Sequence, residues 1–136
     1  MKKRLIFAAL ALVWLGFIFW NSAQDADASG SMSSTLLSLL NLPISEHLLR
    51  KIAHFVQFAL LGFLVSGALT HGKMPWGWLL FTVLCCACVD ETIQAFSLGR
   101  SSKLSDVWLD LAGSVTGIGA FWAFVKIKEK LTIAKH

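Results

Sequence analysis

Charged side chains are scarce in this sequence, and the common signatures of soluble enzymes are absent from it. Of its 136 residues, 15% are charged and 56% are hydrophobic, with a mean hydropathy of +0.67. A soluble domain of this length needs a more polar surface, so the composition predicts one integral membrane domain over residues 1–136. The chain also lacks a Gly-x-Ser-x-Gly nucleophile elbow, a His-Glu-x-x-His metal helix and a Gly-Lys-Ser/Thr phosphate loop.

Cysteine is also rare, since Cys85, Cys86 and Cys88 are the whole set. No cysteine elsewhere can pair with them in a disulfide, and their spacing on one helix does not bring three thiolates to one metal ion. We interpret them as small apolar packing residues. They predict neither a disulfide framework nor a cofactor.

Four apolar stretches account for most of the chain and predict transmembrane helices. A helix needs about 20 apolar residues to cross a hydrocarbon core of about 30 Å. The first and third stretches are short by this measure, so we expect them to include flanking polar residues such as Asn21 and Glu91. The predicted fold is an all-α, polytopic bundle with four spans. Their approximate bounds are residues 5–20, 52–70, 75–91 and 107–125.

The basic residues favour an orientation with both termini in the cytoplasm. With four spans, this orientation places eight of the 12 Lys and Arg residues on the cytoplasmic side and seven of the eight carboxylates on the other. Cytoplasmic loops of membrane proteins usually carry such an excess of positive charge. The net charge of +4 therefore indicates contact with anionic lipid and not with nucleic acid.

The segments between the spans carry further signals. A basic start, an apolar core and Ala26-Asp27-Ala28 resemble a cleaved secretory signal, but the bulky residues 17–20 favour a retained first span. Residues 21–32 are predicted to be a loop, and residues 35–40 a short amphipathic helix on the outer interface. Ser45 is the expected N-cap of the second spanning helix. Residues 71–75 predict a tight cytoplasmic turn.

Unusual polar residues gather at the ends of the spans that we place at the outer, non-cytoplasmic face. Asp90 and Glu91 end the third span, where adjacent carboxylates are costly to bury and usually serve a function or pair with a cation. Arg50, His54 and Gln57 recur at a spacing that places them on one helix face. We therefore expect a polar cluster at this face. Its candidate residues are Arg50, Lys51, His54, Gln57, Asp90, Glu91, Gln94, Arg100, Ser105, Asp106 and Asp110.

Each candidate also has a purely structural interpretation. Asp90 or Glu91 could pair with a nearby Arg or Lys and hold the helices in register. His54 could donate to a backbone carbonyl, and the glutamines could be interhelical hydrogen-bond links. Asp110 lies about one turn into the bilayer, where an unpaired carboxylate is expected to take up a proton or find a cation.

Small residues in the fourth span predict close helix packing. Gly113 and Gly117 are four residues apart, and such pairs let another helix approach. The expected facing surface is Gly62 and Ser66-Gly67 in the second span. A homo-oligomer formed through Gly113 and Gly117 is the alternative.

The order and spacing of these blocks resemble those of the VanZ-like membrane proteins over nearly the whole chain. The matching blocks are Arg50-Lys51-x-x-His54-Phe55-x-Gln57-Phe58-x-x-Leu61-Gly62, Asp90-Glu91-x-x-Gln94-x-Phe96-x-x-Gly99-Arg100, Ser105-Asp106 and Gly113-x-x-x-Gly117. Two positions depart from the family pattern, which usually has Glu-Tyr at Gln57-Phe58 and Asn at Asp110. If that Glu is an essential acid or base, this chain has lost it or has moved its role to another carboxylate.

The resemblance implies a small multi-pass helical protein of the bacterial cell envelope, placed in the cytoplasmic (inner) membrane. The founding member of the family is similar to a teicoplanin-resistance accessory protein, and most relatives have no settled biochemical activity. Resistance is therefore one expectation among others for this chain.

Two function classes remain open, and the first is a binding protein. In this class the outer face binds an anionic lipid, a lipid-linked cell-wall precursor or a glycopeptide, and thereby lowers susceptibility to glycopeptides of the teicoplanin type. Arginine suits this task because its guanidinium contacts phosphate with two donors. The cations expected to hold the head group are Arg50, Lys51, Arg100 and Lys103.

The second class is a membrane-embedded enzyme that acts on a phospholipid or lipid-linked head group. His54 would be the general base or nucleophile, Asp90 or Glu91 would orient it, and Arg100 would stabilise the developing charge. In one variant Asp90 and Asp106 share a proton. No resident metal is predicted, although a metal held by His54, Asp90 and Glu91 is chemically feasible.

Overall fold

The computed structural model describes residues 2–41, 43–69, 76–100 and 103–133, which fold into five α-helices with no strand among them. Four of these helices are long and apolar enough to cross a membrane, and α2 is the exception. The prediction of an all-α fold with four membrane spans is therefore confirmed. The helices are α1 (Lys2–Ser22), α2 (Ala26–Leu40), α3 (Glu46–Leu69), α4 (Trp76–Phe96) and α5 (Leu104–Ile133).

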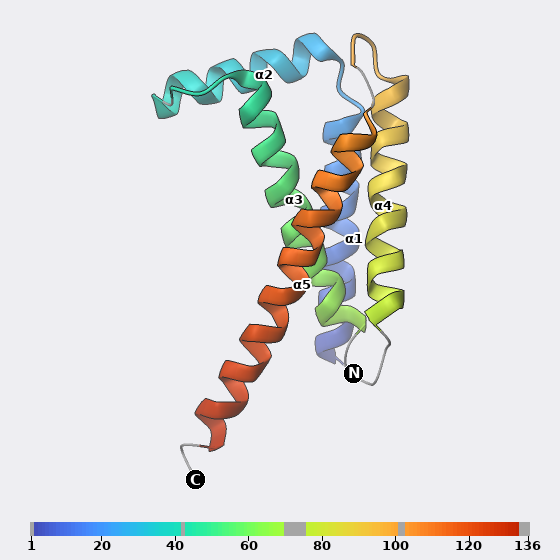
Figure 1. Ribbon diagram of the computed structural model, residues 1–136, viewed down its shortest axis with the longest axis vertical. Helices are drawn as coiled ribbons and strands as arrows, with labels where there is room; N and C mark the ends of the chain where they lie inside the picture. Colours follow the sequence, from blue (N-terminus) through green and yellow to red (C-terminus); the bar gives the residue numbers. More distant parts are fainter. Residues whose placement is uncertain (1, 42, 70–75, 101–102, 134–136) are drawn as a thin grey trace.

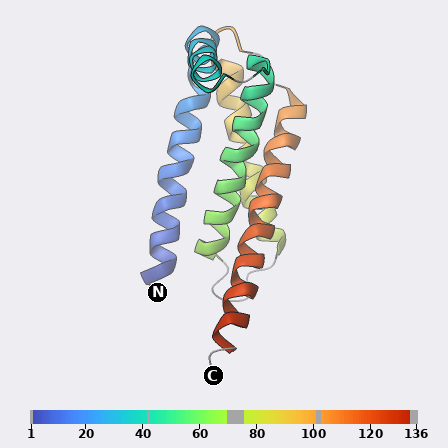
Figure 2. The ribbon, with the colours of Figure 1, turned by 90° about the vertical axis from the view of Figure 1, so that its left-hand side faces the viewer.

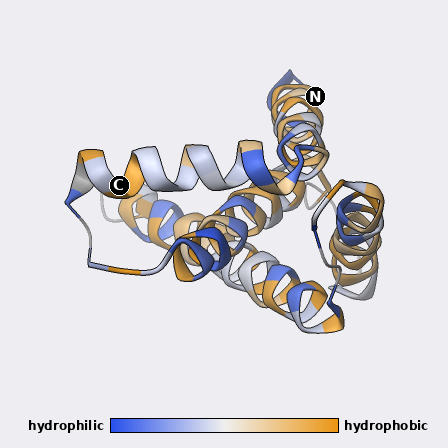
Figure 3. Cartoon of the chain, turned by 90° about the horizontal axis from the view of Figure 1, so that it is seen from above, coloured by the Kyte–Doolittle hydropathy of each residue, from blue (hydrophilic) through white to orange (hydrophobic). Residues whose placement is uncertain are grey.

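The four spanning helices run along the long axis of the molecule, and α2 crosses one end of them (Figure 1). The first helix starts and the last helix finishes at the end opposite α2, as Figure 2 shows from the side. Figure 3 shows α2 from above, stretched across the bundle while the other helices are seen more nearly end-on. Helices α3 and α5 form the most extensive contact between elements. The polar ends of α3, α4 and α5 therefore meet near α2.

The chain between α1 and α3 differs from the prediction of a loop over residues 21–32. The first helix continues through Ser22, and α2 already begins at Ala26. Asp25 caps α2, since its carboxylate accepts a hydrogen bond of 2.8 Å from the Ala28 N–H. The helix predicted over residues 35–40 is the second half of α2, which ends where Asn41 adopts a left-handed conformation.

Two further local predictions concern the ends of α3. Ser45 is its N-cap, as expected, because the Leu48 N–H donates to the Ser45 hydroxyl over 3.2 Å. The predicted turn at residues 71–75 lies outside the described residues, as do the predicted span boundaries at residues 70 and 75.

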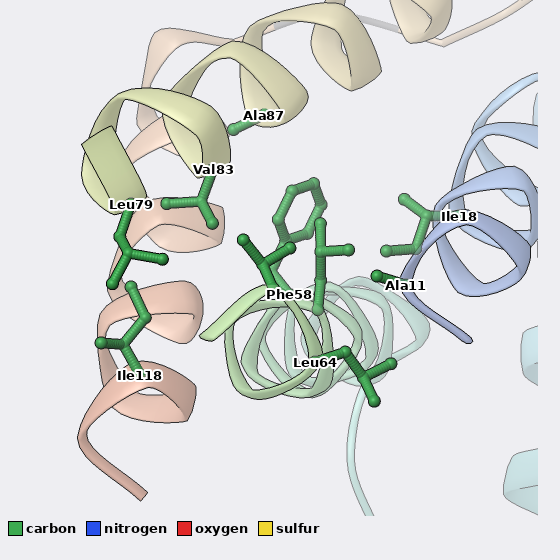
Figure 4. Close-up of a cluster of buried hydrophobic side chains, with 10 residues drawn as sticks. Ala11, Ile18, Phe58, Leu64, Leu79, Val83, Ala87 and Ile118 are labelled. Carbon is green, nitrogen blue, oxygen red and sulfur yellow. The ribbon is translucent and has the colours of Figure 1, made fainter. Parts of the chain in front are cut away.

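The apolar core lies between the spanning helices, which leaves many apolar side chains on the outside. The labelled side chains in Figure 4 come from α1, α3, α4 and α5, and Phe58, which is fully buried, lies among them. By contrast, Leu12 and Val13 of α1 are 70% and 74% exposed. Such exposure is unfavourable in water but natural in a hydrocarbon solvent, where no hydrophobic force drives side chains inward. This distribution agrees with a membrane protein.

Small residues account for the close approach of α3 and α5. A side chain at Gly117 would collide with the Ala59 backbone, and one at Gly113 would collide with the Phe55 carbonyl oxygen. Gly62 of α3 similarly lies against the Ser114 backbone. The predicted packing role of Gly62, Gly113 and Gly117 is confirmed. Gly67 was also expected to face the last span, but it lies against the Phe7 ring of α1 instead. A homo-oligomer through Gly113 and Gly117 would have to displace α3, because α3 already covers both residues.

Candidate functional site

A cavity of about 150 Å³ lies near the α2 end of the bundle, between α3, the end of α4 and the start of α5. The ends of three helices supply its walls, which explains why residues far apart in the sequence share it. We call it the basic cavity. It is lined by His47, Arg50, Lys51, His54, Gln94, Gly99, Arg100, Lys103, Asp106 and Leu109.

Positive charge exceeds negative charge around this cavity. Its lining includes Arg50, Lys51, Arg100 and Lys103 but only one carboxylate, Asp106, which lies 3.9 Å from the Lys51 Nζ. The Arg50 Nε is buried without a hydrogen-bond partner. Burial and the neighbouring Arg50 guanidinium lower the pKa of Arg100, since both disfavour its charged form. An anion in the cavity would relieve this repulsion.

Arg100 also holds the α4–α5 connection against the end of α1. Its Nη1 donates to the carbonyl oxygens of Asn21, Ser22 and Gln24 over 3.2–3.4 Å. A cation is favourable there because the last carbonyls of a helix carry partial negative charge. Gly99, with a φ of 72°, provides the left-handed backbone that turns the chain toward this contact.

Beside the basic cavity lies a buried group formed by His54, Asp90 and Asp110, which we call the His–Asp–Asp cluster. The His54 Nδ1 lies 3.5 Å from the Asp110 Oδ1 and 3.7 Å from the Asp90 Oδ2. Both carboxylates are fully buried, and His54 is 6% exposed. Gln94 donates a hydrogen bond to the Asp90 Oδ2 over 2.9 Å. His54 and Gln94 also line the cavity, so the cluster adjoins it.

The cluster forms because each member continues the buried stripe of its own helix. On α3, α4 and α5, buried residues recur at intervals of three and four, which is the spacing of one helix face. Packing these three stripes together brings one polar residue from each helix to the same level. The stripes are His54, Phe58, Leu61 and Val65 on α3, Val83, Ala87, Asp90 and Gln94 on α4, and Asp110, Ser114, Gly117 and Phe121 on α5.

Glu91 occupies a different environment from its neighbour Asp90, because adjacent residues project about 100° apart around a helix. Its Oε1 accepts a hydrogen bond from the Lys103 backbone N–H, at the start of α5. Glu91 is buried, and it is not among the lining residues of the basic cavity. Its contact joins α4 to the first turn of α5.

The remaining candidates lie at the rim or away from the cavity. Ser105 donates to the Asp106 Oδ1 over 3.1 Å, beside the contact of Asp106 with Lys51. Gln57 does not line the cavity, although its buried Oε1 has no hydrogen-bond partner and its backbone oxygen accepts from the Trp14 Nε1. Among the described residues, no Lys or Arg forms an ion pair with the carboxylates of the cluster.

The geometry also includes features that the sequence analysis did not anticipate. His47 lines the cavity, and its spacing to Arg50, Lys51 and His54 follows one helix face, so the helical pattern contained this signal. The proximity of Asp110 to His54 could not be predicted from the sequence, because it depends on how α3 packs against α5.

The family model described as VanZ/LLP1 matches residues 7–126. The chain belongs to this family. The match confirms the resemblance drawn from the polar blocks, and together with the four apolar helices it identifies a VanZ-like membrane protein. No curated protein and no solved structure matches the chain.

The arrangement in this VanZ/LLP1 protein can support two kinds of chemistry. The basic cavity can hold an anion through its guanidinium and ammonium groups. The adjoining His–Asp–Asp cluster offers a ring nitrogen and four carboxylate oxygens, which can exchange protons or ligate a metal ion. His54 belongs to both, so chemistry at the cluster would act on a group bound in the cavity.

Proposed function

We propose that this VanZ-like membrane protein binds the anionic head group of a lipid, or of a lipid-linked cell-wall precursor, in the basic cavity. The observation that carries the proposal is the excess of cations around one small cavity, with Arg50 and Arg100 close enough to repel each other. Guanidinium groups suit phosphate because they donate two parallel hydrogen bonds to it. The head group would neutralise the cavity while its acyl or polyprenyl chain stays in the membrane.

The size of the cavity favours a head group over a whole glycopeptide. Sites for drug-sized molecules have volumes of roughly 300–1,000 Å³, whereas the basic cavity has about 150 Å³. A phosphate or a similarly small anionic group matches this space. Lower susceptibility to teicoplanin-type glycopeptides would then follow from binding of the lipid-linked precursor, and not from capture of the antibiotic.

The proposed cellular setting is the inner membrane of a bacterium, with both termini in the cytoplasm. Lys126, Lys128 and Lys130 follow the spanning part of α5, at the end of the bundle where α1 begins. The positive-inside bias supports a cytoplasmic position for this end. The basic cavity would then face the outer surface, where lipid-linked cell-wall precursors are used.

The first prediction concerns Arg50, whose Nε is buried without a protein partner. We expect Arg50→Ala to weaken binding of anionic lipid by about 10- to 100-fold, because a hydrogen bond to a charged group contributes roughly 1.5–3 kcal/mol. Native mass spectrometry of protein titrated with phosphatidylglycerol measures the change. Lys126→Ala, at the far end of α5, removes the same charge and should bind like the wild type. Equal losses in both variants would refute a specific head-group site.

A second candidate function, an enzyme acting on the bound head group, is favoured by the position of His54. This side chain lines the cavity and faces two buried carboxylates, which can orient it for proton transfer. In this reaction Asp90 and Asp110 would orient the imidazole. Glu91, which accepts a hydrogen bond from the Lys103 N–H, would only stabilise the fold and would take no part in the reaction.

The second prediction separates this candidate from simple binding. If the protein is an enzyme, His54→Gln should lower head-group turnover at least 100-fold and leave binding of the lipid within about threefold, since general acid–base catalysis contributes about 10²–10⁴-fold. Product release from purified lipids in detergent micelles, followed by mass spectrometry, measures turnover. A wild-type protein that binds lipid without converting it would eliminate the enzyme and retain the binding function.

A further inference from the structure

We propose that His54, Asp90 and Asp110 form a binding site for a divalent first-row transition-metal ion, for which Zn²⁺ is the reference probe. The three residues come from α3, α4 and α5, and their ligand atoms all lie within 4.8 Å of one another. The site goes beyond head-group binding, and it does not depend on it, because its ligands belong to the buried cluster and not to the cations of the cavity.

The distances in the cluster suit one shared ion. Ligand atoms about 2.1 Å from a tetrahedral Zn²⁺ lie about 3.4 Å from each other. The His54 Nδ1 lies 3.5 and 3.7 Å from the nearest oxygens of Asp110 and Asp90. These separations are too long for strong hydrogen bonds but close to the edges of a metal tetrahedron. Small adjustments of the side chains would therefore bring all three atoms to one ion.

The unpaired polar atoms of the cluster also suit a bound cation. The His54 Nδ1, the Asp90 Oδ1 and both Asp110 oxygens are buried without a hydrogen bond of standard geometry. Among the described residues no Lys or Arg pairs with these carboxylates, and the Arg100 Nη1 is directed to carbonyls at the end of α1. Buried carboxylates need a counter-charge or a proton. One divalent ion supplies the charge and uses the unpaired lone pairs.

The surroundings provide the support that metal ligands usually have. Gln94 donates to the Asp90 Oδ2 and restrains the orientation of that carboxylate. One imidazole and two carboxylates favour ions between the hard and soft limits, from Mn²⁺ to Zn²⁺, over Mg²⁺ or Cu⁺. His54 and Gln94 border the basic cavity, so an ion in the cluster would lie next to a head group bound there.

The test measures metal content and metal spectra of the full chain, purified in detergent without a histidine tag, stripped with a chelator and reloaded with Zn²⁺, Mn²⁺ or Co²⁺. We expect one Zn²⁺ per chain by elemental mass spectrometry and at least a tenfold loss of affinity in His54→Gln and Asp110→Asn. Asp27→Asn removes a carboxylate from the exposed face of α2 and should bind like the wild type.

The spectrum of the Co²⁺ form identifies the ligands without any variant, which matters if a substitution prevents folding. Nitrogen and oxygen ligation gives visible d–d bands without the near-ultraviolet band of a thiolate–Co²⁺ bond. Such a thiolate band would assign the metal to Cys85, Cys86 or Cys88 and overturn the proposal. Failure of the wild type to retain any of the three ions would overturn it too, and the cluster would then be a proton-sharing one. Loss of lipid binding in Arg50→Ala with full metal content would separate the two proposals.

Discussion

At the scale of single residues, two neighbours in the sequence have different tasks. Asp90 faces His54 across the interior of the bundle, whereas Glu91 receives the Lys103 N–H at the start of α5. A rotation of about 100° between adjacent helical residues accounts for this division. A motif of two adjacent carboxylates is therefore not one chemical unit in this protein.

The third prediction tests the separate role of Glu91. Glu91→Ala should destabilise the protein by about 1–3 kcal/mol, because the backbone N–H of Lys103 loses its acceptor. Glu91→Gln keeps an oxygen acceptor and should recover most of that loss. Thermal unfolding in detergent, followed by tryptophan fluorescence, measures both variants. Equal destabilisation by alanine and glutamine would instead assign the effect to the negative charge.

At the scale of elements, the contact between α3 and α5 positions the site. Gly113 and Gly117 let the two backbones approach, and the same contact brings His54 of α3 near Asp110 of α5. Sequence spacing could identify the small-residue face, because glycines four residues apart lie on one side of a helix. It could not supply the relative translation of the two helices, which decides which polar residues face each other.

The fourth prediction compares two glycines of α5. Gly117→Ala should destabilise the fold by about 1–3 kcal/mol through overpacking, because its new methyl group would collide with the Ala59 backbone. Gly119→Ala is the matched control, since a methyl group there meets no atom within 4 Å. Helix propensity should make that control neutral or more stable, by up to about 1 kcal/mol. Unfolding by SDS measures both, and equal effects would contradict a tight α3–α5 interface.

The prediction of a loop over residues 21–32 was wrong, because α2 already begins at Ala26. The Ser-, Ala- and Asp-rich segment predicted a loop, because these residues compete with helical hydrogen bonds. In the structure Asp25 caps the helix, and α2 packs against α3. Capping and tertiary contact therefore outweigh the weak helix propensity of this segment.

At the scale of the whole molecule, the bundle has two different ends (Figure 1). Helix α2 and the basic cavity lie at one end, and the start of α1 and the end of α5 lie at the other, because an even number of helices spans between them. The orientation relative to the membrane rests on charge. The exposed residues of α2 should therefore lie outside the cell, and the end of α5 inside it.

The fifth prediction tests this orientation by cysteine labelling in intact cells. Ser31→Cys, at an exposed position of α2, should react with a membrane-impermeant maleimide from outside. Lys130→Cys, near the end of α5, should react only after lysis. Both variants carry Cys85, Cys86 and Cys88 changed to serine, so that the new thiol is the reactive one. The reverse labelling pattern would place the basic cavity at the cytoplasmic face.

The sequence by itself determined that the protein lies in a membrane, how many helices cross it and which polar residues lie at the helix ends. Those features follow from the length, hydropathy and helical spacing of local segments, such as the cap at Ser45 and the stripe from Arg50 to His54. Only the tertiary structure decided that Asp110 joins His54 and Asp90 while Glu91 turns to α5. The physical reason is that a local pattern defines which face of a helix is buried, whereas the register between packed helices defines what that face meets.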